Sequence, residues 1–295
     1  MSQTVQLEHM AMKKIIVPYD FSREAQNGIS LAAQLADYFQ ATIQLLHVQK
    51  NRGLSSTEIE REKEAIKKRF DQALEQITPI VPSGIPIEYV IRYGKVYREI
   101  CAQAEADEDT IIVASTHGAS GFEELFIGSN ALRLISASQK PVYTIHHGVE
   151  ARRFGQLILP LDTSFGSRQK AAYVANAAKV YGCPVSILAI AERPSEKLME
   201  KLAAYTKQVE EYLKKQDVEY KVYHVEGMDF VDAAITFSKD KPDALIVITE
   251  QDKNGLPVFL IGDKSQRFLC ESPVPVLILP PRVNLKGGDS FHTFG

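Results

Sequence analysis

Residues 13–48 read "KKIIVPYDFSREAQNGISLAAQLADYFQATIQLLHV", and the same pattern returns at residues 155–190 as "GQLILPLDTSFGSRQKAAYVANAAKVYGCPVSILAI". Each copy gives an apolar strand, a Pro-x-Asp step, a serine, an alanine-rich amphipathic helix and a second strand. Asp20 matches Asp162, and Val48 matches Ile190, both at an offset of 142. An internal repeat of this length predicts two domains of the same fold in tandem.

A second pair of stretches supports the duplication. Residues 111–145, "IIVASTHGASGFEELFIGSNALRLISASQKPVYTI", match residues 245–279, "LIVITEQDKNGLPVFLIGDKSQRFLCESPVPVLIL", at an offset of 134. The first copy therefore carries eight more residues in its middle than the second, from the difference of the two offsets. We expect domains at residues 13–148 (the first half) and 154–282 (the second half), a disordered leader at 1–12 and a tail at 283–295.

Strand and helix patterns alternate within each copy. In the first half we expect strands near 13–18, 42–48, 86–92, 110–115 and 141–146, and helices near 22–39, 57–78, 95–106 and 129–138. A charged helix at 196–215 takes the place of 57–78 in the second half. Strands that are apolar on both faces suit a parallel sheet covered by helices on both sides. The predicted fold class is α/β, with two tandem doubly wound parallel-sheet domains.

Composition excludes several function classes. The 295 residues carry a net charge of -3 at a pI near 6.2, which gives no basic surface for nucleic acid. No apolar run is long enough for a membrane span or a signal peptide, so we expect a cytoplasmic protein without a membrane partner. The cysteines Cys101, Cys183 and Cys270 stand far apart, as expected for reduced thiols rather than a metal site.

Residues 115–130, "STHGASGFEELFIGSN", are the candidate ligand loop. They connect an apolar strand to a helix, and ligands of open α/β sheets bind at the carboxyl ends of the strands. Gly118 and Gly128 allow a phosphate to approach the backbone, while Ser129 and the free N–H groups at the helix start offer donors. Asp20, in the loop after the first strand, offers a carboxylate for a ribose hydroxyl or an adenine amino group.

Each of these residues also has a simpler interpretation. Ser129 is a good N-cap for the helix, and Asp20 is a good N-cap or turn residue before the helix at 22–39. His117 reads as a solvent-exposed loop histidine. His146 and His147 are adjacent on a strand and cannot both face one metal ion, so no metal site is expected there.

Together the motifs resemble those of the universal stress protein family, over residues 13–282. Nucleotide-binding members carry Gly-x-x-Gly, nine residues, and then Gly-Ser or Gly-Thr; here Ser115 stands at the first glycine, followed by Gly118 and by Gly128-Ser129 at the same spacing. The resemblance implies an adenine-nucleotide α-hydrolase-like fold. It implies a site for ATP or AMP, with Mg2+ accompanying ATP, in the first half. The implied site residues are Pro18, Asp20, Val48, Ser115, His117, Gly118, Gly128, Ser129 and Asn130.

The second half departs from this pattern. Asp252 replaces the second glycine and Asp263 replaces Ser129, and two carboxylates would repel a polyphosphate. We therefore expect a degenerate second site, with Asp263 serving the helix start. Domains of this family associate through their last strands, which are "PVYTI" and "PVLIL" here. The resemblance thus implies an internal pseudo-dimer, with a homodimer of chains as a further assembly.

Three functions remain as hypotheses. The first is a stress-response regulator that binds an adenine nucleotide in the first half and signals through its conformation or an unknown protein partner. The second is a nucleotide-free interaction scaffold of the same fold, favoured by Ser115 and the degenerate second half. The third is a ligase-like or redox enzyme. No nucleophile–base set, P-loop or Gly-x-Gly-x-x-Gly motif is present, so we expect no enzyme, with slow ATP hydrolysis at most.

Overall fold

Ten strands, eight α-helices and one 3-10 turn form the described part of the chain. The computed structural model describes residues 10, 12–23, 25–50, 53, 55–116, 128–146, 148–164, 167–168, 170–250 and 263–281. The strands of the first half are β1 (Lys14–Pro18), β2 (Thr42–Gln49), β3 (Ile87–Tyr93), β4 (Thr110–Ser115) and β5 (Val142–Ile145). Its helices are α1 (Ala25–Phe39), α2 (Ser56–Ile77), α3 (Val96–Glu105) and α4 (Ser129–Ala137), and a 3-10 turn, η1 (Thr78–Ile80), follows α2.

The second half repeats this order. Its strands are β6 (Gln156–Leu161), β7 (Val185–Ala191), β8 (Tyr220–Glu226), β9 (Ala244–Thr249) and β10 (Val276–Leu279). Its helices are α6 (Ala171–Tyr181), α7 (Glu196–Lys215), α8 (Phe230–Ser238) and α9 (Asp263–Glu271). The α/β alternation and the doubly wound parallel arrangement expected from the sequence are confirmed.

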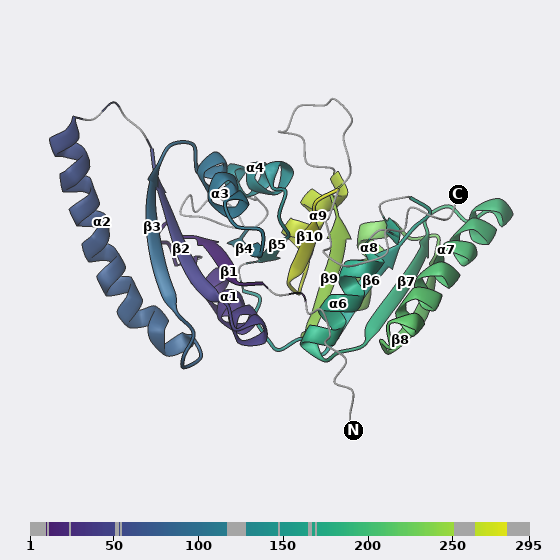
Figure 1. The fold of residues 1–295 in the computed structure, drawn as a ribbon. Helices are drawn as coiled ribbons and strands as arrows, with labels where there is room; N and C mark the ends of the chain where they lie inside the picture. Colours follow the sequence, from purple (N-terminus) through teal and green to yellow (C-terminus); the bar gives the residue numbers. More distant parts are fainter. Residues whose placement is uncertain are drawn as a thin grey trace, which may run out of the picture.

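All ten strands belong to one sheet in the order β3-β2-β1-β4-β5-β10-β9-β6-β7-β8. Neighbours within each half are parallel, whereas β5 and β10 pair antiparallel, with Tyr143 opposite Leu277. The last strands of the two halves thus meet at the centre of the sheet, as the resemblance implied. Figure 1 shows the two halves side by side around this central pair.

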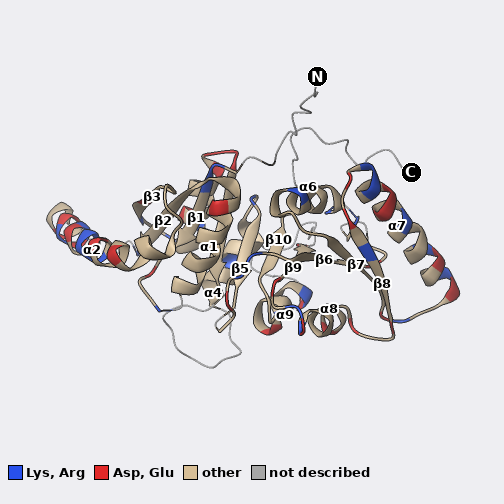
Figure 2. Cartoon of the chain, turned by 90° about the horizontal axis from the view of Figure 1, so that it is seen from below, with Lys and Arg blue, Asp and Glu red and all other residues tan. Residues whose placement is uncertain are grey.

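Helices cover both faces of the sheet. One hydrophobic cluster joins the sheet to α1, α2, α6 and α7, and a second joins the opposite face to α3, α4, α8 and α9. Alternate strand residues point to opposite faces, so Ile15 enters the first cluster and Ile16 the second. Lys, Arg, Asp and Glu gather along the outer helices α2 and α7 (Figure 2). In the described part of the chain, no helix is long and apolar enough to cross a membrane.

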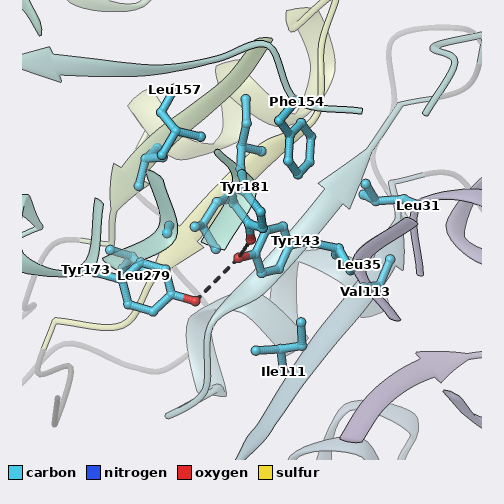
Figure 3. Close-up of a cluster of buried hydrophobic side chains, with 14 of the residues drawn as sticks. Leu31, Leu35, Ile111, Val113, Tyr143, Phe154, Leu157, Tyr173, Tyr181 and Leu279 are labelled. Atoms are coloured by element: carbon cyan, nitrogen blue, oxygen red, sulfur yellow. Dashed lines mark hydrogen bonds between the residues drawn. The ribbon is translucent and has the colours of Figure 1, made fainter. Parts of the chain in front are cut away.

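The junction between the halves holds three buried tyrosines. Tyr143 of β5 lies among apolar side chains with Tyr173 and Tyr181 of α6, and their hydroxyl groups meet (Figure 3). At the edge of the junction, the Arg153 guanidinium pairs with the Asp37 carboxylate at 2.6 Å. The first helix of the second half therefore packs on the last strand of the first half.

Candidate functional site

The carboxyl ends of β1 and β4 form the edge at which the site is expected. From β1 the chain proceeds to β2 and β3 on one side, and β4 lies on the other side of β1. The strand order therefore reverses between β1 and β4, where doubly wound sheets bind their ligands. Pro18 is the last residue of β1 and Ser115 the last residue of β4. These two predicted site residues thus end neighbouring strands.

Asp20 stands in the turn after β1. Its Oδ1 accepts a hydrogen bond from the Ser22 amide at 3.0 Å, and the Ser22 hydroxyl accepts one from the Ala25 amide at 3.2 Å. Asp20 therefore shapes the turn and Ser22 serves the start of α1, in agreement with the turn interpretation. Asp20 is exposed, so its carboxylate is also accessible at this edge of the sheet.

An aromatic side chain that no sequence pattern marked holds the same turn. Phe21 has a φ of 64°, and this left-handed conformation costs a non-glycine residue about 1–2 kcal/mol. Its ring lies 4.8 Å from that of Phe70 and 4.9 Å from that of His47, measured between centroids, and the Arg69 guanidinium lies 4.0 Å above it. These contacts fix the turn that carries Asp20.

Val48 lies one residue before the end of β2. Leu46 of β2 pairs with Pro18 of β1, and Val48 pairs with Arg92 of β3. Val48 therefore lies two residues beyond the pairing of β2 with the end of β1, and it is partly buried against the second hydrophobic cluster. Its position at the carboxyl edge is the one that the sequence predicted.

Ser115 brings an unsatisfied polar group to the edge. Its Oγ is shielded from solvent and has no hydrogen-bond partner within the described ranges. A buried hydroxyl without a partner costs roughly 1–3 kcal/mol. Gly28 of α1 lies nearby: a Cβ added there would stand 3.6 Å from the Ser115 amide nitrogen and 3.7 Å from a Val17 methyl group. Gly28 therefore contributes no side chain to the contact between α1 and the end of β4.

The start of α4 faces the end of β4. The Gly128 amide donates to the Thr116 carbonyl at 3.1 Å, which ties the beginning of this helix to the strand end. Gly128 is the N-cap and makes no side-chain capping bond, and Ser129 is the first helical residue. The interpretation of Ser129 as N-cap is therefore wrong by one residue. Ser129 and Asn130 are both exposed.

The backbone does not itself require a glycine at 128. Gly128 has a φ of -57°, which any L-residue adopts, and a Cβ there would meet no atom of the described residues within 4 Å. The space beside this glycine is thus available to a ligand at a helix start, where free N–H groups favour anions. His117 and Gly118, the other predicted loop residues, lie outside the described residues, as does Asp252 of the second half.

The equivalent edge of the second half is occupied by ion pairs. The Asp162 Oδ1 accepts hydrogen bonds from the Ser164 amide at 2.9 Å and the Ser164 hydroxyl at 2.5 Å. The Lys264 ammonium lies 3.7 Å from the Asp162 carboxylate and 2.9 Å from that of Glu192. Asp263 begins α9, and an acidic residue in the first turn suits the helix dipole. Where the first half has the exposed Asn130, the second half thus has Lys264, which is paired with Asp162 and Glu192.

No metal cluster accompanies either edge in the part of the chain that the structure covers. Groups of three or more His, Cys, Asp or Glu side chains arranged for an ion are absent among those residues.

Residues 12–146 match the family model described as "Universal stress protein family". The first half of the chain is therefore similar to universal stress proteins. Universal stress protein MJ0577 of Methanocaldococcus jannaschii is 26% identical over 152 residues, which cover 45% of this chain and 94% of that protein.

Solved structures agree with a tandem universal stress protein fold. A universal stress protein from Archaeoglobus fulgidus superposes with a TM-score of 0.74 and 19% identity, covering 92% of this chain and 99% of that one. A protein of unknown function from Pseudomonas aeruginosa gives a TM-score of 0.63 and 19% identity, covering 92% and 94%. At these identities the likeness concerns the fold, and it extends over both halves.

Proposed function

We propose that this protein binds one adenine nucleotide, ATP or AMP, in its first half, and that the bound nucleotide changes its conformation or its affinity for a protein partner. The observation that carries the proposal is the start of α4. Gly128 has an ordinary backbone conformation, and among the described residues no atom occupies the place of a side chain there and no side chain caps the helix. A phosphate needs such a space to reach the helix N–H groups.

Two neighbours complete the proposed site. The Ser115 hydroxyl at the end of β4 has no hydrogen-bond partner among the residues that the structure describes, and the exposed Asp20 carboxylate lies just after β1. In the proposal Asp20 accepts from the ribose or the adenine, Ser115 and Ser129 serve the phosphates, and Val48 with Pro18 contacts the base. Mg2+ would accompany ATP by offsetting the charge of its phosphates.

The test is calorimetric titration of ATP, and separately of AMP, into the protein and two variants. Gly128→Val places a branched side chain in the open space, and Gly262→Val makes the same change at the equivalent position of the second half. We expect about one nucleotide per chain for the wild type and for Gly262→Val. Gly128→Val should bind at least about tenfold more weakly, a loss of about 1.4 kcal/mol or more in binding free energy.

Folding must be checked in parallel. A non-polar residue at an N-cap changes helix stability by only about 1 kcal/mol, so Gly128→Val should stay folded by circular dichroism. Equal affinity of both variants for the nucleotide would contradict the proposed site. Absence of binding to the wild type at millimolar nucleotide would instead favour the nucleotide-free scaffold. In the second half, ion pairs already occupy the equivalent edge.

A further inference from the structure

Gly28 and Lys170 occupy the same position in the two halves. Gly28 follows Asp20 by eight residues, and Lys170 follows Asp162 by eight. Gly28 lies within α1 and Lys170 is the N-cap residue of α6, and both are buried, with only 3% of Lys170 exposed. Lys170 thus carries a side chain of four methylene groups and an ammonium group, where Gly28 has only a hydrogen atom.

The Lys170 side chain reaches the carboxyl edge of the second half. Its ammonium group is attracted by the Asp162 carboxylate and repelled by the Lys264 ammonium, and both of these residues stand at that edge. Lys170 is the N-cap residue of α6, so its Cα lies at the end of the helix that faces the turn after β6. At the corresponding position of the first half, Gly28 packs against the end of β4, where an added Cβ would be in van der Waals contact with the Ser115 amide nitrogen and Val17.

The charges at this edge are matched to one another. Burial lowers the pKa of Lys170 to about 8, against the opposing attraction of Asp162, so the ammonium form still predominates at pH 7. Burial would raise the pKa of Asp162, but hydrogen bonds from Ser164 and Ser167 and the positive charge of Lys170 together lower it. A buried cation is tolerated when an anion compensates it. The Asp162 carboxylate attracts the Lys170 ammonium group, and it also pairs with Lys264 at 3.7 Å.

On the basis of the proposed function, we propose that the residue at position 28 or 170 decides which half binds nucleotide. Gly28 leaves the first site open. Lys170 fills the equivalent space of the second half with its own alkylammonium group and acts there as an internal ligand of Asp162.

The internal ligand is tested by replacing it. Lys170→Gly should create a cavity shaped for n-butylammonium, which reproduces the lost side chain, and Lys170→Met should fill the same volume without the charge. We expect about 50 mM butylammonium to raise the melting temperature of Lys170→Gly by roughly 2–4 °C more than sodium at the same concentration. The wild type and Lys170→Met should show no such difference. An equal response of all three proteins would overturn the proposal.

The open site is tested by closing it. Gly28→Lys should abolish ATP binding in the calorimetric titration, while Gln26→Lys, which adds the same charge to an exposed position of α1, should leave affinity unchanged. Retained binding in a folded Gly28→Lys variant would overturn the proposal. If the wild type binds no nucleotide, the proposed function fails by itself, and the response of Lys170→Gly to butylammonium still decides whether Lys170 acts as an internal ligand.

Discussion

The phenolic oxygens of Tyr143 and Tyr181 lie 2.5 Å apart, in a hydrogen bond that joins the last strand of the first half to the first helix of the second (Figure 3). The Tyr173 oxygen lies 3.4 Å from that of Tyr143. In the repeat, Tyr143 corresponds to Leu277 and Tyr181 to Phe39. Tyr143 and Tyr181 therefore form a polar contact on one side of the pseudo-twofold junction. Their counterparts on the other side, Leu277 and Phe39, are apolar residues.

Removing one hydroxyl from this cluster should destabilise the whole chain. Tyr143→Phe leaves the hydroxyls of Tyr173 and Tyr181 buried without their shared partner, so we expect a loss of roughly 1–3 kcal/mol in the free energy of unfolding. Urea unfolding followed by circular dichroism measures this. Tyr223→Phe, at a position 37% exposed, is the control and should change stability by less than about 0.5 kcal/mol. Equal effects of the two variants would mean that the cluster contributes no more than a surface hydroxyl.

At position 21 we expect a glycine variant to be more stable than an alanine variant, which is the reverse of the usual order. Phe21→Ala removes the ring contacts with Phe70 and His47 but keeps the left-handed φ of 64°, whereas Phe21→Gly relieves that conformation. We expect the glycine variant to be more stable than the alanine variant by about 1 kcal/mol. Thermal unfolding of both variants decides the matter, and a more stable alanine variant would show that residue 21 is not held in the left-handed region.

Lys170 predicts a stability that rises with pH. Its pKa is about 8 in the folded chain and near 10.4 when unfolded, so the unfolded state binds more protons between these values. Below pH 8 the penalty for the buried charge is present in full, and it is relieved as pH rises toward about 10.4. Between pH 7.5 and 9.5 the wild type should therefore gain on Lys170→Met by up to about 1.4 kcal/mol per pH unit. Parallel stability curves for the two proteins would contradict the buried charge.

Two of the three thiols should be unreactive in the folded chain. Burial raises the pKa of Cys101 to about 11, and burial together with Asp243 raises that of Cys183 to about 12, so the thiolate is scarce at neutral pH. Cys270 is only partly buried. We expect one fast-reacting thiol with a chromogenic disulfide at pH 8, and three after denaturation. Cys270→Ser should abolish the fast phase, and a fast phase that survives in this variant would show that a buried thiol is accessible.

The element boundaries followed closely from the sequence. The charged helix expected at 196–215 has these same bounds as α7, and the strands of the first half lie within one or two residues of expectation. Apolar runs on both faces and the duplicated order suffice for this, because they reflect burial between two helical layers. The central pairing of β5 with β10 came from the family resemblance.

Three features of the edges depend on neighbours that the sequence does not place. Ser129 is the first helical residue rather than the N-cap, because the backbone dihedrals of Gly128 set the helix start. The positive φ of Phe21 depends on the aromatic contacts around it. Lys170 is buried within the influence of the Asp162 charge, which the sequence does not show, although its alignment with Gly28 is visible in the repeat.

The most direct test of the central claim is a crystal structure of the chain grown with a non-hydrolysable ATP analogue. We expect one nucleotide per chain, with its phosphates at the Gly128–Ser129 helix start and its sugar or base near Asp20. We also expect the Lys170 side chain to fill the corresponding place in the second half. A nucleotide bound in the second half, or a first half left empty at saturating analogue, would contradict these expectations.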